Sequence, residues 1–238
     1  MKKLICVCFY AFLSLCVVFG IWSFSYSGEV MEKVPVAGFS TDTMKEGAPA
    51  GWELVKSKGV PDIKLEKEGE MFALHLKSDK SSSFGIKKEV KNDPMRNPFL
   101  NWKWKVTRLP SGGDVRDKKS DDQALQLYVA FEATGWPAKL NIPVIGYIWD
   151  NEAPKGTVVK SSQLLADKVK YIVLRDKTDT LGEWSSEKRD VRDDYKKLFS
   201  DIDNGKVRKI EGISIYINSQ HTESEAEGYI YDIYFSSE

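Results

Sequence analysis

The chain has 238 residues and carries 35 Lys and Arg against 35 Asp and Glu, so its formal net charge is 0. A zero net charge argues against a nucleic-acid binder that uses a broad basic face. With 42% apolar and 29% charged residues, the composition is that of a globular protein and excludes a disordered or collagen-like chain. No long apolar run follows residue 24, which excludes a polytopic membrane protein.

The N-terminus has the pattern of a secretory signal peptide. Lys2 and Lys3 precede an uncharged, mostly apolar stretch over residues 4–24, and Ser25-Tyr26-Ser27 supplies small residues before a cleavage site. We expect a signal peptide over residues 1–27 and export from the cytoplasm. Because the stretch is nearly long enough to span a bilayer, an uncleaved N-terminal anchor is the alternative. In both cases the two lysines hold the N-terminus inside and the body lies outside the cytoplasm.

All three cysteines, Cys6, Cys8 and Cys16, lie in this leader. Residues 28–238 therefore contain no cysteine and can form no disulfide, thiol nucleophile or thiolate metal site. A body of this size must be stabilised by its hydrophobic core.

Two-residue alternation of apolar and polar side chains dominates the body and predicts β-strands. Such strands are expected over residues 72–76, 100–107, 125–131, 213–217 and 229–235, and more fully buried strands over residues 144–149 and 169–174. In the last alternating strand we expect Tyr229, Tyr231, Ile233 and Phe235 to share one face. The only helix expected is short, over about residues 192–199. Turn signals separate the strands, so we predict an all-β fold, an antiparallel β-sandwich or jelly roll with one short helix, as a single domain over residues 28–238.

Six tryptophans lie in the body. Trp102 and Trp104 share the apolar face of their strand, which predicts core positions for both. Trp149 and Trp184 lie near expected loops and are better candidates for ligand contact. Trp136, followed by Pro137, is expected to be exposed in a hairpin loop.

The sequence contains no strong catalytic or cofactor motif. His75 and His221 stand alone, and there is no nucleophile elbow, P-loop or dinucleotide fingerprint. We therefore predict no catalytic residue, no cofactor and no metal site. Asp121 and Asp122 could bind Ca²⁺ with loop carbonyls, or one could act as a general acid. Because adjacent strand residues point to opposite faces, we favour a solvated charge pair at the start of a strand, or carboxylates that cap loop amides, over a shared site.

The densest polar segment surrounds Trp184 and continues through residues 187–195. A tryptophan ring stacks on the apolar face of a sugar, while a guanidinium and a carboxylate bond its hydroxyls. We predict a ligand-binding groove for a neutral glycan formed by Asp122, Trp149, Trp184 and Arg189. The alternative is a loop-to-helix junction that Arg–Asp pairs hold together, with Asp193 or Asp194 at the helix N-terminus.

The order of several short motifs resembles a bacterial exported family known as domain of unknown function 3047. The matching segments are residues 101–106 (Asn-Trp-Lys-Trp-Lys-Val), 120–122 (Ser-Asp-Asp), 128–131 (Tyr-Val-Ala-Phe), 147–149 (Tyr-Ile-Trp), 182–184 (Gly-Glu-Trp), 189–191 (Arg-Asp-Val), 211–215 (Glu-Gly-Ile-Ser-Ile) and 231–235 (Tyr-Asp-Ile-Tyr-Phe), with Asp194, Tyr195 and Phe199. The resemblance covers about residues 39–235 and implies an exported bacterial β-sandwich, located in the periplasm of a Gram-negative cell, with no established activity. The chain departs from the pattern at Gln126, where an arginine is expected. It also departs at residues 218–222, where a carboxylate-rich run is expected.

Three functions fit these observations. The first is a non-catalytic, carbohydrate-binding-like β-sandwich whose partner is a neutral glycan and not a nucleic acid. The second is a glycoside hydrolase or lyase on the same fold, which needs two carboxylates about 5–10 Å apart across one cleft. The third is an envelope protein-interaction domain. Fold alone does not choose between them.

Overall fold

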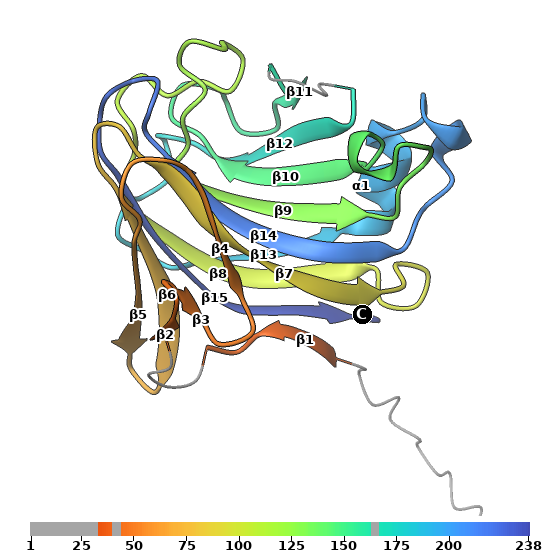
Figure 1. Cartoon of the computed structure of the whole chain (residues 1–238), viewed down its shortest axis with the longest axis horizontal. Coiled ribbons are helices and arrows are strands. Elements are labelled where there is room, and N and C mark those ends of the chain that lie inside the picture. Colours follow the sequence, from red (N-terminus) through yellow and green to blue (C-terminus); the bar gives the residue numbers. More distant parts are fainter. Residues whose placement is uncertain (1–32, 40–43, 163–166) are drawn as a thin grey trace, which may run out of the picture. The chain divides into compact units, whose positions relative to one another are not determined.

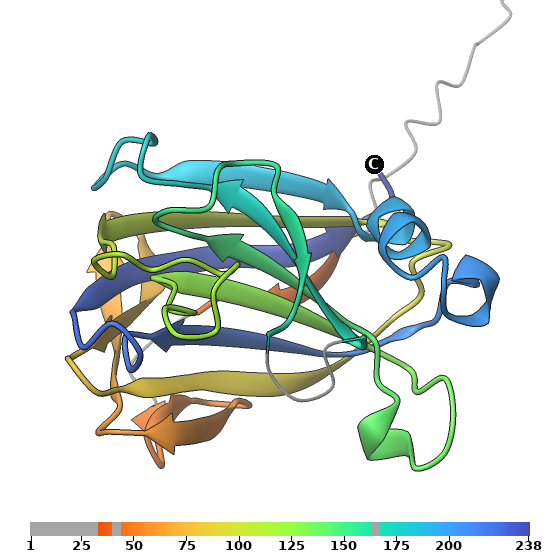
Figure 2. The ribbon, with the colours of Figure 1, turned by 90° about the horizontal axis from the view of Figure 1, so that it is seen from above.

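Two β-sheets face each other in a sandwich (Figures 1 and 2). The computed structural model describes residues 33–39, 44–162 and 167–238, so the expected signal peptide over residues 1–27 lies outside the described residues. Within those ranges, no helix is long and apolar enough to cross a membrane. The predicted β-sandwich with one short α-helix is confirmed.

One sheet has six strands in the order β13-β8-β15-β6-β5, and β1 pairs with β15. All of its pairings are antiparallel. Its strands are β1 (Lys33–Ala37), β5 (Asp62–Glu68), β6 (Met71–Ser78), β8 (Phe99–Arg108), β13 (Ser185–Asp190) and β15 (Ala226–Ser236). A separate two-stranded ribbon joins β2 (Met44–Lys45) and β3 (Ala48–Pro49).

The other sheet has seven strands in the order β11-β12-β10-β9-β14-β7-β4. They are β4 (Glu53–Lys58), β7 (Ser83–Asn92), β9 (Leu125–Phe131), β10 (Val144–Trp149), β11 (Val158–Lys160), β12 (Val169–Arg175) and β14 (Ile210–Asn218). This sheet is mixed, because β10 and β12 run parallel while its other pairs are antiparallel. The connection between β10 and β12 contains β11 and is long enough for the crossover that a parallel pair needs.

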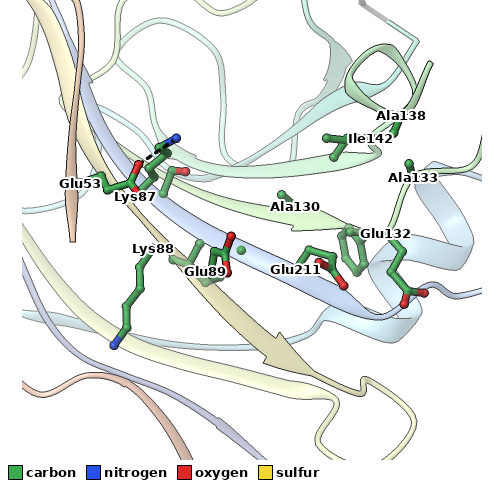
Figure 3. A pocket seen from close by; sticks show the side chains of 14 residues that line it. Glu53, Lys87, Lys88, Glu89, Ala130, Glu132, Ala133, Ala138, Ile142 and Glu211 are labelled. Atoms are coloured by element: carbon green, nitrogen blue, oxygen red, sulfur yellow. Dashed lines mark ion pairs between the residues drawn. The ribbon is translucent and has the colours of Figure 1, made fainter. Parts of the chain in front are cut away.

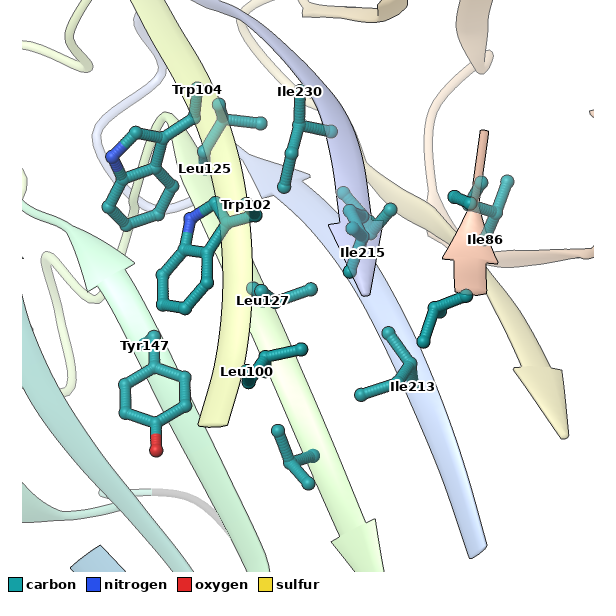
Figure 4. Close-up of a cluster of buried hydrophobic side chains, with 14 of the residues drawn as sticks. Ile86, Leu100, Trp102, Trp104, Leu125, Leu127, Tyr147, Ile213, Ile215 and Ile230 are labelled. Carbon is teal, nitrogen blue, oxygen red and sulfur yellow. The ribbon is translucent and has the colours of Figure 1, made fainter. Parts of the chain in front are cut away.

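The core between the sheets is built on four large aromatic side chains, of which Figure 4 shows Trp102, Trp104 and Tyr147. Trp102 and Trp104 point inward from β8, and Tyr147 and Trp149 point inward from β10. The ring centroids of Trp102 and Tyr147 lie 5.4 Å apart, and those of Trp104 and Trp149 lie 5.7 Å apart. The predicted core positions of Trp102 and Trp104 are therefore confirmed.

A β-bulge changes which residues of the last strand face the core. The pairing of β15 with β8 shifts register between Tyr231 and Tyr234, and Asp232 at the shift has a φ of 55°. Ile230, Ile233 and Phe235 are buried, whereas Tyr229 and Tyr231 face outward. The prediction of one face for Tyr229, Tyr231, Ile233 and Phe235 is wrong, because the bulge adds a residue and reverses the alternation.

The short helix α1 (Val191–Leu198) lies at one end of the sandwich (Figure 2), close to the predicted range. Asp190 caps it by accepting the backbone N–H of Asp193. Its buried Tyr195 packs edge-on against Phe131 at a centroid distance of 4.7 Å. Two short 3₁₀ turns, η1 (Ala138–Leu140) and η2 (Asp203–Gly205), complete the described elements.

We predict that Trp102→Ala and Trp104→Ala each lower the free energy of unfolding by about 3–5 kcal/mol, the usual loss for a buried large aromatic side chain. The matched control is Trp136→Ala, because Trp136 is 91% exposed, as expected. This control should change the free energy by less than about 0.5 kcal/mol. Urea unfolding followed by circular dichroism measures all three. Core variants as stable as the control would contradict the assigned faces of β8.

Candidate ligand-binding groove

Two of the four predicted ligand-binding residues are buried in structural roles. The side chain of Asp122 is 0% exposed. Its Oδ2 accepts the backbone N–H of His221 (2.9 Å), the backbone N–H of Thr222 (2.7 Å) and the hydroxyl of Thr222 (2.8 Å). Asp122 therefore caps the loop after β14. Trp149 is also 0% exposed in the core, so its ring has no free face for a sugar.

The other two predicted residues lie on different surfaces of the sandwich. Trp184, just before β13, packs against Tyr231 on the outer face of the six-stranded sheet at a centroid distance of 4.6 Å. Arg189 of β13 forms an ion pair with Asp194 at 2.6 Å and lines a cavity at the side of the sandwich. The structure does not bring Asp122, Trp149, Trp184 and Arg189 into one groove. The sequence alone does not show in which sheet, on which face or at which edge each of these four residues lies.

The outer face of the seven-stranded sheet has a different character. The register of β9 with β14 places the buried Leu127, Val129 and their partners inward, and it turns the intervening residues to the outside. These outward residues are Gln126, Tyr128 and Ala130 of β9 and Gly212, Ser214, Tyr216 and Asn218 of β14. The small residues Ala130, Gly212 and Ser214 lie on the same face as the tyrosines, and they leave space between the larger side chains.

Three tyrosine rings lie on this face, over glycines of neighbouring strands. A Cβ atom on Gly146 of β10 would lie 2.5 Å from the ring of Tyr171 and 3.1 Å from that of Tyr128. A Cβ atom on Gly85 of β7 would lie 2.8 Å from the ring of Tyr216. These glycines let the rings pack closely against the sheet. Tyr128 and Tyr216 meet edge to face at a centroid distance of 5.7 Å.

A polar depression of about 170 Å³ lies at one end of the tyrosine cluster. Asn218 is its structural centre. Its Oδ1 accepts the backbone N–H of Gln123 (2.8 Å) and the side-chain amide of Gln126, and its Nδ2 donates to the backbone carbonyl of Asp121 (2.7 Å). Gln126 in turn accepts the hydroxyl of Tyr128. The bonded amides are held in fixed orientations, and the lining of the depression includes no Lys or Arg.

A larger cavity of about 420 Å³ lies at the other end of the same sheet face (Figure 3). Ala130 and Gly212 form its floor, and the loop between β9 and β10 contributes Ala133, Ala138 and Ile142. Its rim carries the glutamates Glu53, Glu89, Glu132 and Glu211. Two lysines contribute little free charge, because Lys87 pairs with Glu53 at 3.1 Å and Lys88 points away and donates to the carbonyl of Val36.

The depression and the larger cavity adjoin along β14. Tyr216 lines the first and Ser214 lines the second. Residues two apart on one strand face lie about 7 Å from each other. We call the combined surface the outer groove. It offers a tyrosine ring for stacking, oriented amides for hydrogen bonds and carboxylate acceptors at its far end.

Metal and acid–base chemistry receive little support from the described residues. Among them, no group of three or more His, Cys, Asp or Glu is placed to hold a metal ion. Burial raises the pKa of Asp150 to about 6. Asp150 lines neither part of the outer groove, since its carboxylate accepts the backbone N–H groups of Val115 (3.0 Å) and Ala153 (2.7 Å).

We do not predict the residues of the outer groove from the sequence, although two features of the sequence indicate them. Gln126 and residues 218–222 are the two departures from the family pattern, and the structure joins them through the bond between Gln126 and Asn218. In addition, Tyr128 and Tyr216 occupy outward positions of strands whose other faces are apolar. An outward aromatic side chain in such a strand indicates a contact surface.

The family described as "Protein of unknown function (DUF3047)" matches residues 50–234. The chain belongs to this family. No curated protein matches it.

Several solved sandwich structures are similar in outline. The family 11 carbohydrate-binding module of the cellulase Lic26A-Cel5E of Clostridium thermocellum is 7% identical, with a TM-score of 0.46 and coverage of 86% of this chain and 94% of that one. The family 11 module from Clostridium thermocellum in complex with a mixed-linked tetrasaccharide is 9% identical, with a TM-score of 0.45 and coverage of 85% and 94%. A cellulase derived from Cel12A of Rhodothermus marinus is 11% identical, with a TM-score of 0.41 and coverage of 76% and 98%. Likenesses this distant say nothing of what this chain binds.

We predict that Asp150 makes the protein less stable as the pH rises from about 4 to 6. Its folded pKa of about 6 exceeds the ordinary value of about 3.9, so in this window the folded state binds more protons than the unfolded state. The stability of the wild type relative to Asp150→Asn should therefore fall by about 2–3 kcal/mol between pH 4 and pH 7. Urea unfolding of both proteins at four pH values measures this difference. A difference that stays constant or rises with pH would contradict the burial effect.

Proposed function

We propose that this protein binds a neutral glycan chain in the outer groove without catalysing a reaction. The observation that carries the proposal is the half-exposed side chain of Tyr216, which lines the amide-rich depression and lies two residues along β14 from Ser214 of the larger cavity. We place this function in residues 28–238, as a single domain exported to the periplasm after removal of residues 1–27.

The chemistry of the depression suits sugar hydroxyls. An aromatic ring packs against the apolar C–H face of a pyranose, and amides can both donate to and accept from hydroxyl groups. Gln126 and Asn218 are already oriented by their own hydrogen bonds, so little side-chain entropy is lost when a ligand binds. Gln220 and His221, at the rim of the depression, contact each other at 3.2 Å and complete its polar edge.

The charges of the outer groove favour a neutral ligand over an anionic one. Of the four glutamates on the rim of the larger cavity, Glu53 pairs with Lys87 and Glu211 pairs with Lys91. Glu89 and Glu132 remain to repel uronates or sulfated sugars. The same carboxylates accept hydrogen bonds from neutral sugar hydroxyls. Because such binding does not depend on ion pairs, it should be insensitive to moderate salt.

A binding role is favoured over hydrolysis by the position of Asp150. A glycosidase needs a carboxylic acid with a raised pKa close to the scissile bond. Asp150 is the carboxylic acid whose pKa burial raises to about 6, and it is 0% exposed and bonded to backbone amides. It therefore cannot reach a glycan in the outer groove without refolding of its loop.

We predict that Tyr216→Ala weakens binding of a neutral oligosaccharide about tenfold or more, because it removes the stacking ring. A glycan array of neutral gluco-, manno-, galacto- and xylo-oligosaccharides identifies the ligand, and titration calorimetry measures the affinity. Gln220→Ala should also weaken binding through the loss of a rim amide.

The matched control is Tyr234→Ala, which removes an outward tyrosine from β15 of the other sheet. It should leave the affinity unchanged, and the melting temperatures should show that all the variants fold. No bound neutral glycan on the array, or equal affinity for Tyr216→Ala and the wild type, would refute the proposal.

A further inference from the structure

A second cavity, of about 510 Å³, opens on the side of the sandwich, where the edges of the two sheets approach each other. β12 borders it from the seven-stranded sheet, β13 from the six-stranded sheet, and α1 closes one end. This cavity is separate from the outer groove and shares no lining residue with it. It includes Arg189, which the sequence had singled out.

The wall of the side cavity is apolar. Ile172 and Leu174 of β12 and Leu198 of α1 contribute to it, and Val158 of β11 adds a side chain that is 56% exposed. An exposed valine beside buried aliphatic residues extends the apolar surface to the mouth of the cavity. Such a surface gains free energy when an apolar chain covers it.

The mouth of the side cavity is rich in cations. Its lining carries four positive side chains, Lys155, Arg175, Arg189 and Lys197, and two negative ones, Glu187 and Asp194. Asp179, behind the rim, takes one further ion pair from Arg175 (2.9 Å) and one from Lys155 (2.8 Å). The carboxylate of Asp176 accepts the backbone N–H of Lys155 at 2.7 Å. Four carboxylates therefore accompany four cations, and among the described residues Lys197 is the cation of the mouth whose side chain pairs with none of them.

The two guanidinium groups are held in place by these carboxylates. Arg189 makes a forked pair with Asp194 at 2.6 and 3.0 Å, and Arg175 donates through Nε to Glu187 at 2.7 Å. The side chain of Lys197 is exposed on α1 and forms no ion pair or side-chain hydrogen bond with another described residue. The cation without a carboxylate partner is therefore a lysine that is free to move over the mouth of the cavity.

We propose that the side cavity binds a monoanion with an apolar tail, of the fatty-acid class. The carboxylate head lies among Arg175, Arg189 and Lys197, and the acyl chain covers Ile172, Leu174 and Val158. The lysine side chain without a carboxylate partner matches a single carboxylate, and the aliphatic wall matches a hydrocarbon chain. The site does not depend on glycan binding in the outer groove.

The test is titration calorimetry of the full chain with sodium decanoate below its micelle concentration. Acetate supplies the head without the tail, and decyltrimethylammonium supplies the same tail with the opposite charge. We expect decanoate to bind at least tenfold more tightly than either of them. Equal binding of acetate, equal binding of decyltrimethylammonium, or no binding of decanoate at millimolar concentration would each overturn the proposal.

Two adjacent lysines provide a matched pair of variants. Lys197→Glu should weaken decanoate binding at least tenfold, because it replaces the free cation at the mouth by an anion. Lys196→Glu makes the same charge change one residue earlier on α1, where the side chain is exposed and does not line the cavity, and it should leave the affinity unchanged. Val158→Asp, at an exposed position on the apolar wall, should also weaken binding. Equal effects of the two lysine variants would show a general charge effect and refute the site.

Discussion

The contact between Trp102 and Trp104 of one sheet and Tyr147 and Trp149 of the other determines the orientation of both sheets. Once these four rings face inward, the two-residue period of a β-strand fixes the direction of every other side chain on β8 and β10. The hydrogen-bonded register of β10 with β9, and of β9 with β14, then determines which side chains of β9 and β14 point inward. The outer groove is therefore a consequence of the core, because Tyr128 and Tyr216 can point only outward while Leu127 and Ile215 are buried.

The glycines of the seven-stranded sheet give that outward face its shape. Side chains at Gly85 and Gly146 would collide with the tyrosine rings, so the absence of a Cβ atom lets the rings lie close to the backbone. The side cavity arises from a different constraint. β13 is the edge strand of the six-stranded sheet, and β12 lies next to β11, the edge strand of the seven-stranded sheet. The ion pair of Arg175 with Glu187 joins β12 to β13, the pair of Arg189 with Asp194 joins β13 to α1, and an apolar wall lies between them. One sandwich thus presents a hydrogen-bonding face and a side that carries a lysine without a carboxylate partner.

Much of the fold follows from local patterns in the sequence. Alternation identified the strands that contain Trp102, Trp104 and Leu127, and α1 was placed within one residue of its observed ends. Two kinds of error have physical causes. The bulge at Asp232 reverses the alternation of β15. The alternation of apolar and polar residues does not predict where a strand contains such an extra residue. Trp149 ends a continuous apolar run, in which no polar neighbour distinguishes an inward from an outward residue.

The ligand-binding residues could not be predicted in the same way. Asp122, Trp184 and Arg189 were chosen for their side-chain chemistry, but a shared site also requires that the strands carrying them lie next to each other. Strand order depends on long-range pairings such as β9 with β14 and β13 with β8, which bring together residues between 79 and 91 positions apart. Gln126 and Asn218 became neighbours only through such a pairing.

The central claim is that the outward face of β9 and β14 is the glycan-binding surface. Hydrogen–deuterium exchange of the wild-type protein, with and without the neutral oligosaccharide that binds it best, tests this claim most directly. The account predicts that the glycan slows exchange in residues 121–130 and 212–221 and leaves residues 184–189 and 226–236 unchanged. Slower exchange around Trp184 and β15, with no change in β9 and β14, would contradict it.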